Sequence, residues 1–142
     1  MTLSHQDITE IQQLEALYGH AVDAADAALL ARVFATDAVF DFRPTGVDKV
    51  CTGLAEIQAL FAGPGHPKQH MMTNVFVDED AGEVRVRSKW LVRNPRFNAI
   101  YMGEYEDLMT RTADGWRIRR RVCTARDPES FVDPPPALEA AD

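Results

Sequence analysis

The spacing of apolar residues changes from helical to strand-like about a third of the way along the chain. Over residues 4–25 apolar side chains recur at steps of three and four, which predicts an amphipathic helix that Ser4 and Asp7 begin. Residues 26–34 have a similar but shorter pattern and predict a second helix. Over residues 39–42 the period falls to two, which indicates a strand.

The second half of the chain is typical of strands joined by short turns. A short helix is expected after Gly53, and the Gly-Pro-Gly-His-Pro sequence at 63–67 must end it, because proline and glycine interrupt helix and strand alike. Helices first and strands later predict an α+β fold, with helices packed on one face of a curved, mostly antiparallel sheet. The four expected strands cover residues 70–78, 83–93, 98–111 and 116–126.

One domain accounts for the length of 142 residues, and we expect it to cover residues 1–126. Residues 127–142 form a tail rich in proline and acidic residues, which predicts a segment that is extended, or disordered unless it docks on a neighbour. The formal charge of −7 repels phosphate backbones, so we expect no nucleic-acid partner. We also expect no membrane partner, because no apolar run is long enough to span a bilayer. Residues 1–5 lack a secretory pattern, and two isolated cysteines suit a reducing compartment, so the expected location is cytoplasmic.

Among the histidines, His70 is the strongest candidate for chemistry. It begins an expected strand in which Met72, Asn74 and Phe76 alternate, so period two places these four on one face, as in the wall of a ligand pocket. The alternative is a core histidine whose ring is satisfied by a backbone carbonyl. His66 and His70 have the spacing of a helical metal pair, but the prolines forbid that helix, and no metal site is expected.

Three further residues are candidates on weaker grounds. Tyr18 lies in the apolar stripe of the first helix, which is typical of a packing tyrosine. The helical wheel puts Asp23 among polar positions, and it can face inward only if the helix ends or kinks there. Arg121 belongs to an arginine-rich last strand that can pair with Glu104, Glu106 and Asp107, and one such arginine could give a pocket a fixed positive charge. Nucleophile-elbow and phosphate-loop patterns are missing from the sequence, which leaves general acid–base chemistry without a cofactor.

The order of these features resembles the SnoaL-like branch of the nuclear-transport-factor-2-like superfamily over residues 5–126. The resemblance implies a cone-shaped α+β fold, in which a curved sheet and three helices enclose an apolar pocket. It rests on Tyr18-x4-Asp23, on residues 34–38 (Phe-Ala-Thr-Asp-Ala), on Gly53-x3-Ile57, on His70-x3-Asn74 and on Gly115-Trp116-x4-Arg121.

Within that superfamily the pattern is most similar to cofactor-independent dehydratases and lyases such as scytalone dehydratase. The resemblance implies that His70 is the base, that Asp23 orients it, and that Tyr18 and Arg121 assist. Several dehydratases carry a further His or Asp at the segment that corresponds to residues 90–94, and this chain has neither there.

The expected function is therefore elimination, of the dehydratase type, from a small apolar polyketide-, steroid- or aromatic-like molecule. An isomerase or cyclase of the same family, and a non-catalytic binding or scaffold protein, remain alternatives. The resemblance also implies a homodimer or homotrimer. The expected pocket residues are Phe40, Phe61, Met72, Asn74, Phe76 and Trp90.

Overall fold

A computed structural model describes residues 2–94 and 99–127 of the chain. In these residues the helices are α1 (His5–Asp23), α2 (Ala27–Val33) and α3 (Leu54–Ala62), with a short 3-10 turn, η1 (Arg43–Thr45). The strands are β1 (Phe34–Asp41), β2 (Val50–Thr52), β3 (His70–Asp80), β4 (Glu83–Asn94), β5 (Ala99–Thr112) and β6 (Gly115–Ala125). Most of the predicted tail, residues 128–142, lies outside the described residues.

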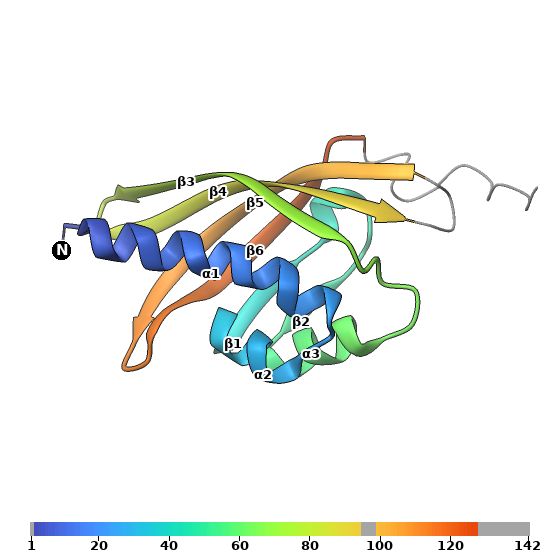
Figure 1. The fold of residues 1–142 in the computed structure, drawn as a ribbon, viewed down its shortest axis with the longest axis horizontal. Helices are drawn as coiled ribbons and strands as arrows, with labels where there is room; N and C mark the ends of the chain where they lie inside the picture. The colour runs from blue at the N-terminus through green and yellow to red at the C-terminus, as the bar shows by residue number, and fades with distance from the viewer. Residues whose placement is uncertain (1, 95–98, 128–142) are drawn as a thin grey trace, which may run out of the picture.

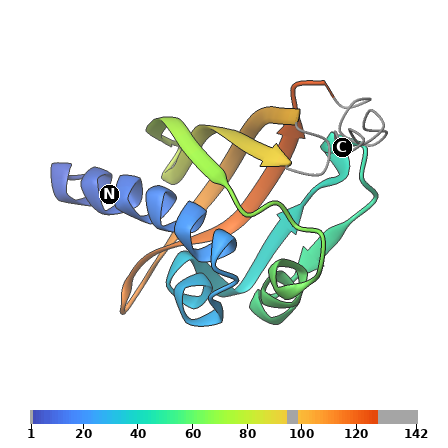
Figure 2. The same cartoon turned by 45° about the vertical axis from the view of Figure 1, so that its right-hand side comes forward.

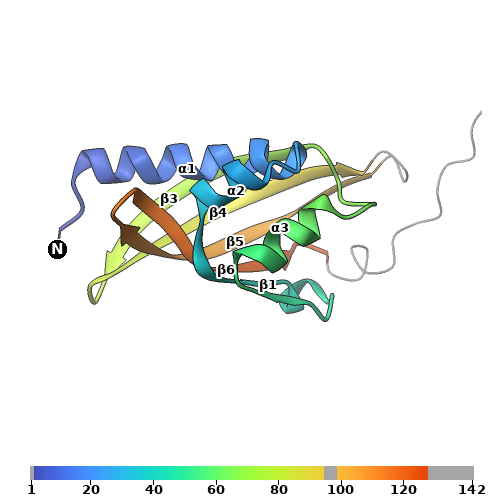
Figure 3. The same ribbon diagram turned by 90° about the horizontal axis from the view of Figure 1, so that it is seen from below.

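The six strands form one open mixed sheet in the order β2-β1-β6-β5-β4-β3 (Figure 1). β1 and β6 run parallel, and every other neighbouring pair is antiparallel. The sheet is strongly curved (Figure 2), and the three helices lie along one of its faces (Figure 3). The predicted α+β class and the mostly antiparallel curved sheet are confirmed.

The first strand begins earlier than its apolar pattern predicts. The expected second helix ends at Val33, and β1 starts at Phe34 rather than at Val39. Its pairing with β6 is irregular between these two residues, and Thr36 and Asp37 are both exposed in succession. Because of this break, the first half of β1 shows no period of two in its sequence, and the pattern does not predict a strand there.

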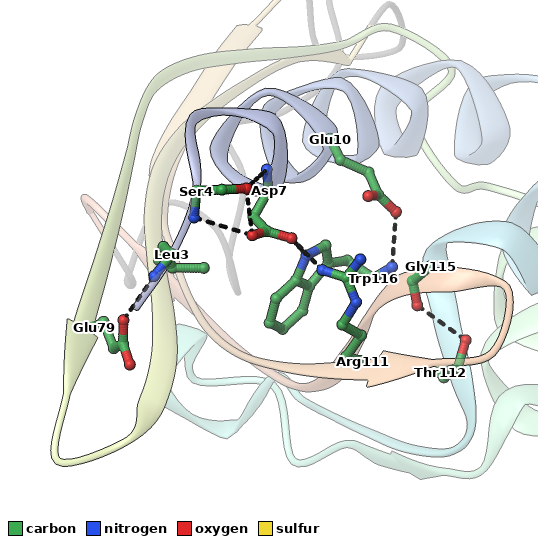
Figure 4. A network of polar contacts seen from close by, with 9 residues as sticks. All are labelled: Leu3, Ser4, Asp7, Glu10, Glu79, Arg111, Thr112, Gly115 and Trp116. Carbon is green, nitrogen blue, oxygen red and sulfur yellow. Dashed lines mark hydrogen bonds and ion pairs between the residues drawn. The ribbon is translucent and has the colours of Figure 1, made fainter. Parts of the chain in front are cut away.

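The start of α1 is anchored to the hairpin between β5 and β6 (Figure 4). The Asp7 carboxylate accepts hydrogen bonds from the backbone N–H and hydroxyl of Ser4, and it pairs with Arg111. The indole N–H of Trp116 also donates to Asp7, over 2.9 Å. These bonds, those from Ser4 above all, hold the pKa of Asp7 well below its usual range.

The hairpin turn allows the helix to approach closely. Glu10 accepts a hydrogen bond of 2.9 Å from the backbone N–H of Trp116 (Figure 4). A Cβ atom at Gly115 would overlap the Glu10 carboxylate, and the φ of +105° at Gly115 also favours glycine. With its first turn held in this way, α1 runs across the sheet and ends beside the start of β3 (Figure 1).

Candidate active site

Asp23 and His70 contact each other where α1 ends and β3 begins. Oδ1 of Asp23 lies 2.7 Å from Nδ1 of His70, and both carboxylate oxygens accept from the backbone N–H of His70 at 3.0 Å. The side chain of His70 is 4% exposed and that of Asp23 is 28% exposed. The carboxylate therefore holds both the strand and the imidazole ring in place.

Two features of α1 make this contact possible. The helix ends at Asp23, so the position of this side chain on the helical wheel no longer determines where it points. One turn earlier, Gly19 allows the helix to lie against the new strand, because a Cβ there would be 3.1 Å from the carbonyl oxygen of His70. The condition under which Asp23 could face inward, an end of the helix at this point, is thus met.

Burial lowers the pKa of His70 below its ordinary value of about 6.5. The hydrogen bond and the negative charge of Asp23 act in the opposite direction, and the positive charge of Arg121 lowers the pKa further. The imidazole is therefore neutral at neutral pH. When its Nδ1–H donates to Asp23, the lone pair on Nε2 is free to accept a proton.

His70 lies in the wall of an apolar cavity of about 190 Å³ between α1, α3 and the sheet. Tyr18 and Tyr105 also belong to the wall, and Lys49 adds a charge at an exposed position. Burial raises the pKa of the Cys123 thiol to about 12, so this thiol is protonated and is a poor nucleophile. The remaining residues of the wall are Phe42, Val47, Leu60, Phe61, His66, Pro67, Trp90 and Val92.

The rings of Tyr18 and Tyr105 pack against the guanidinium group of the buried Arg121. Their hydroxyl oxygens are 3.1 Å apart and share a hydrogen bond. The guanidinium carbon of Arg121 lies 4.2 Å from the ring centre of Tyr18 and 4.1 Å from that of Tyr105. Burial raises the pKa of both hydroxyls, so each remains a hydrogen-bond donor at neutral pH. Arg121 itself is not part of the cavity wall, and its charge reaches the cavity through these rings.

Known proteins share this arrangement of helices and sheet. The family model that describes SnoaL-like domains matches residues 4–122 of this chain. The chain belongs to the SnoaL-like domain family. A Mycobacterium tuberculosis protein, named only as uncharacterised, is 33% identical to this SnoaL-like chain over an alignment of 124 residues. The alignment covers 83% of this chain and 84% of the relative.

Solved structures share the fold of this SnoaL-like chain. A candidate aromatic ring hydroxylase from Novosphingobium aromaticivorans is 28% identical, with a TM-score of 0.70 over 89% of this chain and 94% of its own. A candidate scytalone dehydratase from the same organism is 22% identical, with a TM-score of 0.70 over 84% of each chain. The predicted placement in the SnoaL-like branch is confirmed by the family match, and the latter structure supports the fold alone.

Of the expected pocket residues, Phe61 and Trp90 line the cavity of the SnoaL-like chain. Trp90 faces Gly103 across the β4–β5 pair, and a Cβ at Gly103 would lie 2.5 Å from the indole ring. Phe40 is fully buried in the aromatic core beside Tyr18 and does not form part of the cavity wall. Met72 shares the face of His70 but packs against Gly19 of α1.

Asn74 and Phe76 lie away from the cavity, contrary to the period-two expectation. The pairing of β3 with β4 shifts between Thr73 and Phe76, and Asn74 has a left-handed φ of +53°. This β-bulge inserts an extra residue, so that side chains beyond it change faces. Phe76 is 53% exposed, with the Arg87 guanidinium over its ring, while Val75 and Val77 turn toward the core.

A buried ion cluster lies behind the tyrosines, and the sequence reasoning named Asp107 as a partner of the last strand but missed Glu15. Arg121 donates from Nε and Nη2 to the two oxygens of Asp107, at 2.8 and 2.7 Å, and Nη2 also donates to Glu15 at 2.6 Å. Burial raises the pKa of Glu15 to about 8, so this carboxyl carries a proton at neutral pH. A signal was available, because Glu15 falls between Ile11 and Tyr18 in the helical spacing of the buried stripe.

Among the described residues, no group of three potential metal ligands is gathered in one place. None of the described helices is long and apolar enough to cross a membrane.

Proposed function

We propose that this SnoaL-like protein is a cofactor-independent lyase that eliminates water from a small apolar molecule, with His70 as base and Asp23 as the residue that orients it. The observation that carries the proposal is the 2.7 Å contact between Asp23 and the ring of His70 in the wall of an apolar cavity. A carboxylate beside one ring nitrogen fixes the tautomer and stabilises the imidazolium that forms.

The reaction moves one proton from carbon to oxygen. Nε2 of His70 takes a proton from a carbon next to a carbonyl group, and the electron pair of that C–H bond forms the C=C bond. The C–O bond to the hydroxyl on the next carbon breaks, and the imidazolium returns the proton to that hydroxyl, which leaves as water. General-base catalysis of this kind contributes about 10²–10⁴-fold, so the remainder must come from orientation and charge stabilisation.

The tyrosine pair supports the charge that develops on the substrate carbonyl. Tyr18 and Tyr105 share one hydrogen bond, so a second hydroxyl proton can be donated to an oxygen in the cavity. The guanidinium of Arg121 under both rings favours negative charge at this place.

The first experiment uses 3-hydroxy-1-tetralone, a two-ring β-hydroxy ketone whose dehydration gives fluorescent 1-naphthol. We expect the wild-type protein to release 1-naphthol and the His70→Ala variant to be slower by about 10²-fold or more. His20→Ala is the matched control, because His20 is exposed on α1. Dehydration at the wild-type rate by the His70→Ala variant would exclude His70 as the base.

A second measurement separates elimination from the alternative functions. In heavy water, 1-tetralone exchanges the protons next to its carbonyl if His70 acts as a base on carbon. Exchange without loss of water from the hydroxy ketone would favour an isomerase. Ligand binding without exchange would favour a non-catalytic binding protein.

We also propose that two copies of the chain associate through the outer face of the sheet. An apolar row crosses three strands there, because Met71 faces Leu91 and Leu91 faces Met102. Met71 and Met102 are 52% and 47% exposed, and Ile100, at 59%, lies on the same face. Sedimentation should show a dimer for the wild-type chain and a monomer for Met102→Glu, and equal masses would exclude this interface.

A further inference from the structure

His66 is a second imidazole in the cavity, supplied by the segment between α3 and β3. Its ring stacks on the ring of His70, with centres 5.0 Å apart and planes 11° apart. The ring of Phe61 meets it edge-on at 4.6 Å. These two contacts hold the imidazole of His66 against the base that the proposed reaction uses.

The Nε2 atom of His66 is buried and has no hydrogen-bond partner in the described part of the chain. Buried polar atoms nearly always have a partner, since water that would otherwise satisfy them has been excluded. Burial, together with the neighbouring His70 and against the opposing effect of Asp23, lowers the pKa of His66 to about 4. The ring is therefore neutral at neutral pH and offers one N–H and one lone pair.

The size of the cavity limits which molecules could enter it and form a hydrogen bond with Nε2 of His66. Its volume of about 190 Å³ lies below the roughly 300–1,000 Å³ of pockets for drug-sized molecules. An apolar cavity of about 150 Å³ accommodates benzene. One aromatic ring with a short substituent, or a compact pair of rings, fills this volume, whereas a four-ring steroid skeleton would extend beyond it.

We propose that the cavity takes a one- or two-ring aromatic molecule bearing an oxygen substituent, and that His66, with its ring proton on Nε2, donates a hydrogen bond to this oxygen. The inference rests on the proposed function in one respect, since it places the oxygen of the substrate beside His70. It goes further in naming the class of ligand and a residue that determines specificity.

The test compares acetophenone with α-methylstyrene, which has the same shape but a CH₂ group in place of the oxygen. Binding of each to the wild-type protein and to His66→Phe is measured by titration. We expect the ratio of the two affinities to shift by about tenfold against the ketone in His66→Phe, because only the ketone oxygen can accept a hydrogen bond from the imidazole. The His20→Phe variant, in which an exposed imidazole is replaced, should keep the wild-type ratio. An unchanged ratio in His66→Phe would overturn the proposal.

A measurement on the wild-type protein makes the test independent of how well the variant folds. Acetophenone should shift the Nε2 resonance of His66 in a ¹⁵N spectrum and leave that of His20 unchanged, and no shift at saturation would overturn the proposal. If His66→Phe loses the preference for the ketone but the wild-type protein catalyses neither exchange nor dehydration, the role of His66 stands and the proposed lyase function is wrong. If dehydration depends on His70 but the wild-type protein shows no preference for the ketone, the lyase function stands and the role of His66 is wrong.

Discussion

The carboxylate of Asp23 binds His70 at two places, the backbone N–H at 3.0 Å and the ring Nδ1 at 2.7 Å. The two contacts have different consequences, because the first fixes where β3 begins and the second fixes the tautomer of the ring. They can be separated by substitution.

Replacement of Asp23 by Asn should keep the first contact and remove most of the benefit of the second. The amide oxygen can still accept from the backbone N–H of His70, but it carries no charge to stabilise an imidazolium. We expect dehydration of 3-hydroxy-1-tetralone to slow by about 10²–10⁴-fold, with little change in thermal unfolding. Asp23→Ala should lower the melting temperature as well. A variant Asp23→Asn with full activity would show that orientation by the carboxylate is not needed.

Replacement of Arg121 by Met should destabilise the fold. Both side-chain partners, Asp107 and Glu15, would remain in the core without their cation, and breaking such a buried cluster costs about 3–5 kcal/mol. Chemical denaturation measures the loss, and Arg120→Met, at an exposed position of the same strand, should change stability by less than about 1 kcal/mol. If Arg121→Met keeps its stability but loses activity, the arginine acts in the chemistry rather than in the core.

The protonated Glu15 predicts a specific dependence of stability on pH. Its pKa rises from 4.5 to about 8 on folding, so the folded state binds this proton more tightly than the unfolded state does. The resulting stabilisation is complete below pH 4.5 and is lost as the pH rises to about 8. Glu15→Gln removes the titration, so the variant should be more stable than the wild type at pH 9, by about 1 kcal/mol or more, and similar to it at pH 5.

Denaturant titrations at both pH values test this dependence. The exposed Asp37→Asn provides the control, since it should follow the wild type at each pH. A constant difference between Glu15→Gln and the wild type across the range would mean that Glu15 is ionised in the folded protein.

The bulge in β3 depends on the backbone conformation of Asn74. A β-branched residue at its φ of +53° is strained, so Asn74→Val should destabilise the protein by about 1–2 kcal/mol. Asn74→Gly should be tolerated, and Thr73→Val, one residue earlier on an exposed strand position, should be close to neutral. Equal effects of Asn74→Val and Thr73→Val in thermal unfolding would show that residue 74 does not fix the bulge.

The sequence predicts the order of the helices and of the four long strands after α3, because each has a clear apolar period, but it misses the short strand β2 and the start of β1. The same reasoning fails at Phe76, where the bulge at Asn74 moves every later side chain to the other face. It also places Asp23 in solvent by the helical wheel, and only the resemblance pairs that residue with His70. What decides the matter is the end of α1 at Asp23, a boundary that periodicity locates poorly.

Contacts between distant segments were beyond the sequence argument. Glu15 meets Arg121 from 106 residues away, and the stack of His66 on His70 depends on the path of a loop. The helical spacing of Glu15 within a buried stripe was a usable signal, whereas the orientation of His66 left none in the residue pattern.

Gly103 leaves room for the indole of Trp90, which lines the cavity, although Gly103 itself does not line it. A Cβ at 103 would overlap the backbone oxygen of Thr124 on β6 and lie 2.5 Å from the indole, so even an alanine would force β5 and β6 apart and displace the indole. The shape of the cavity beside Trp90 therefore depends on a residue that is not part of its wall.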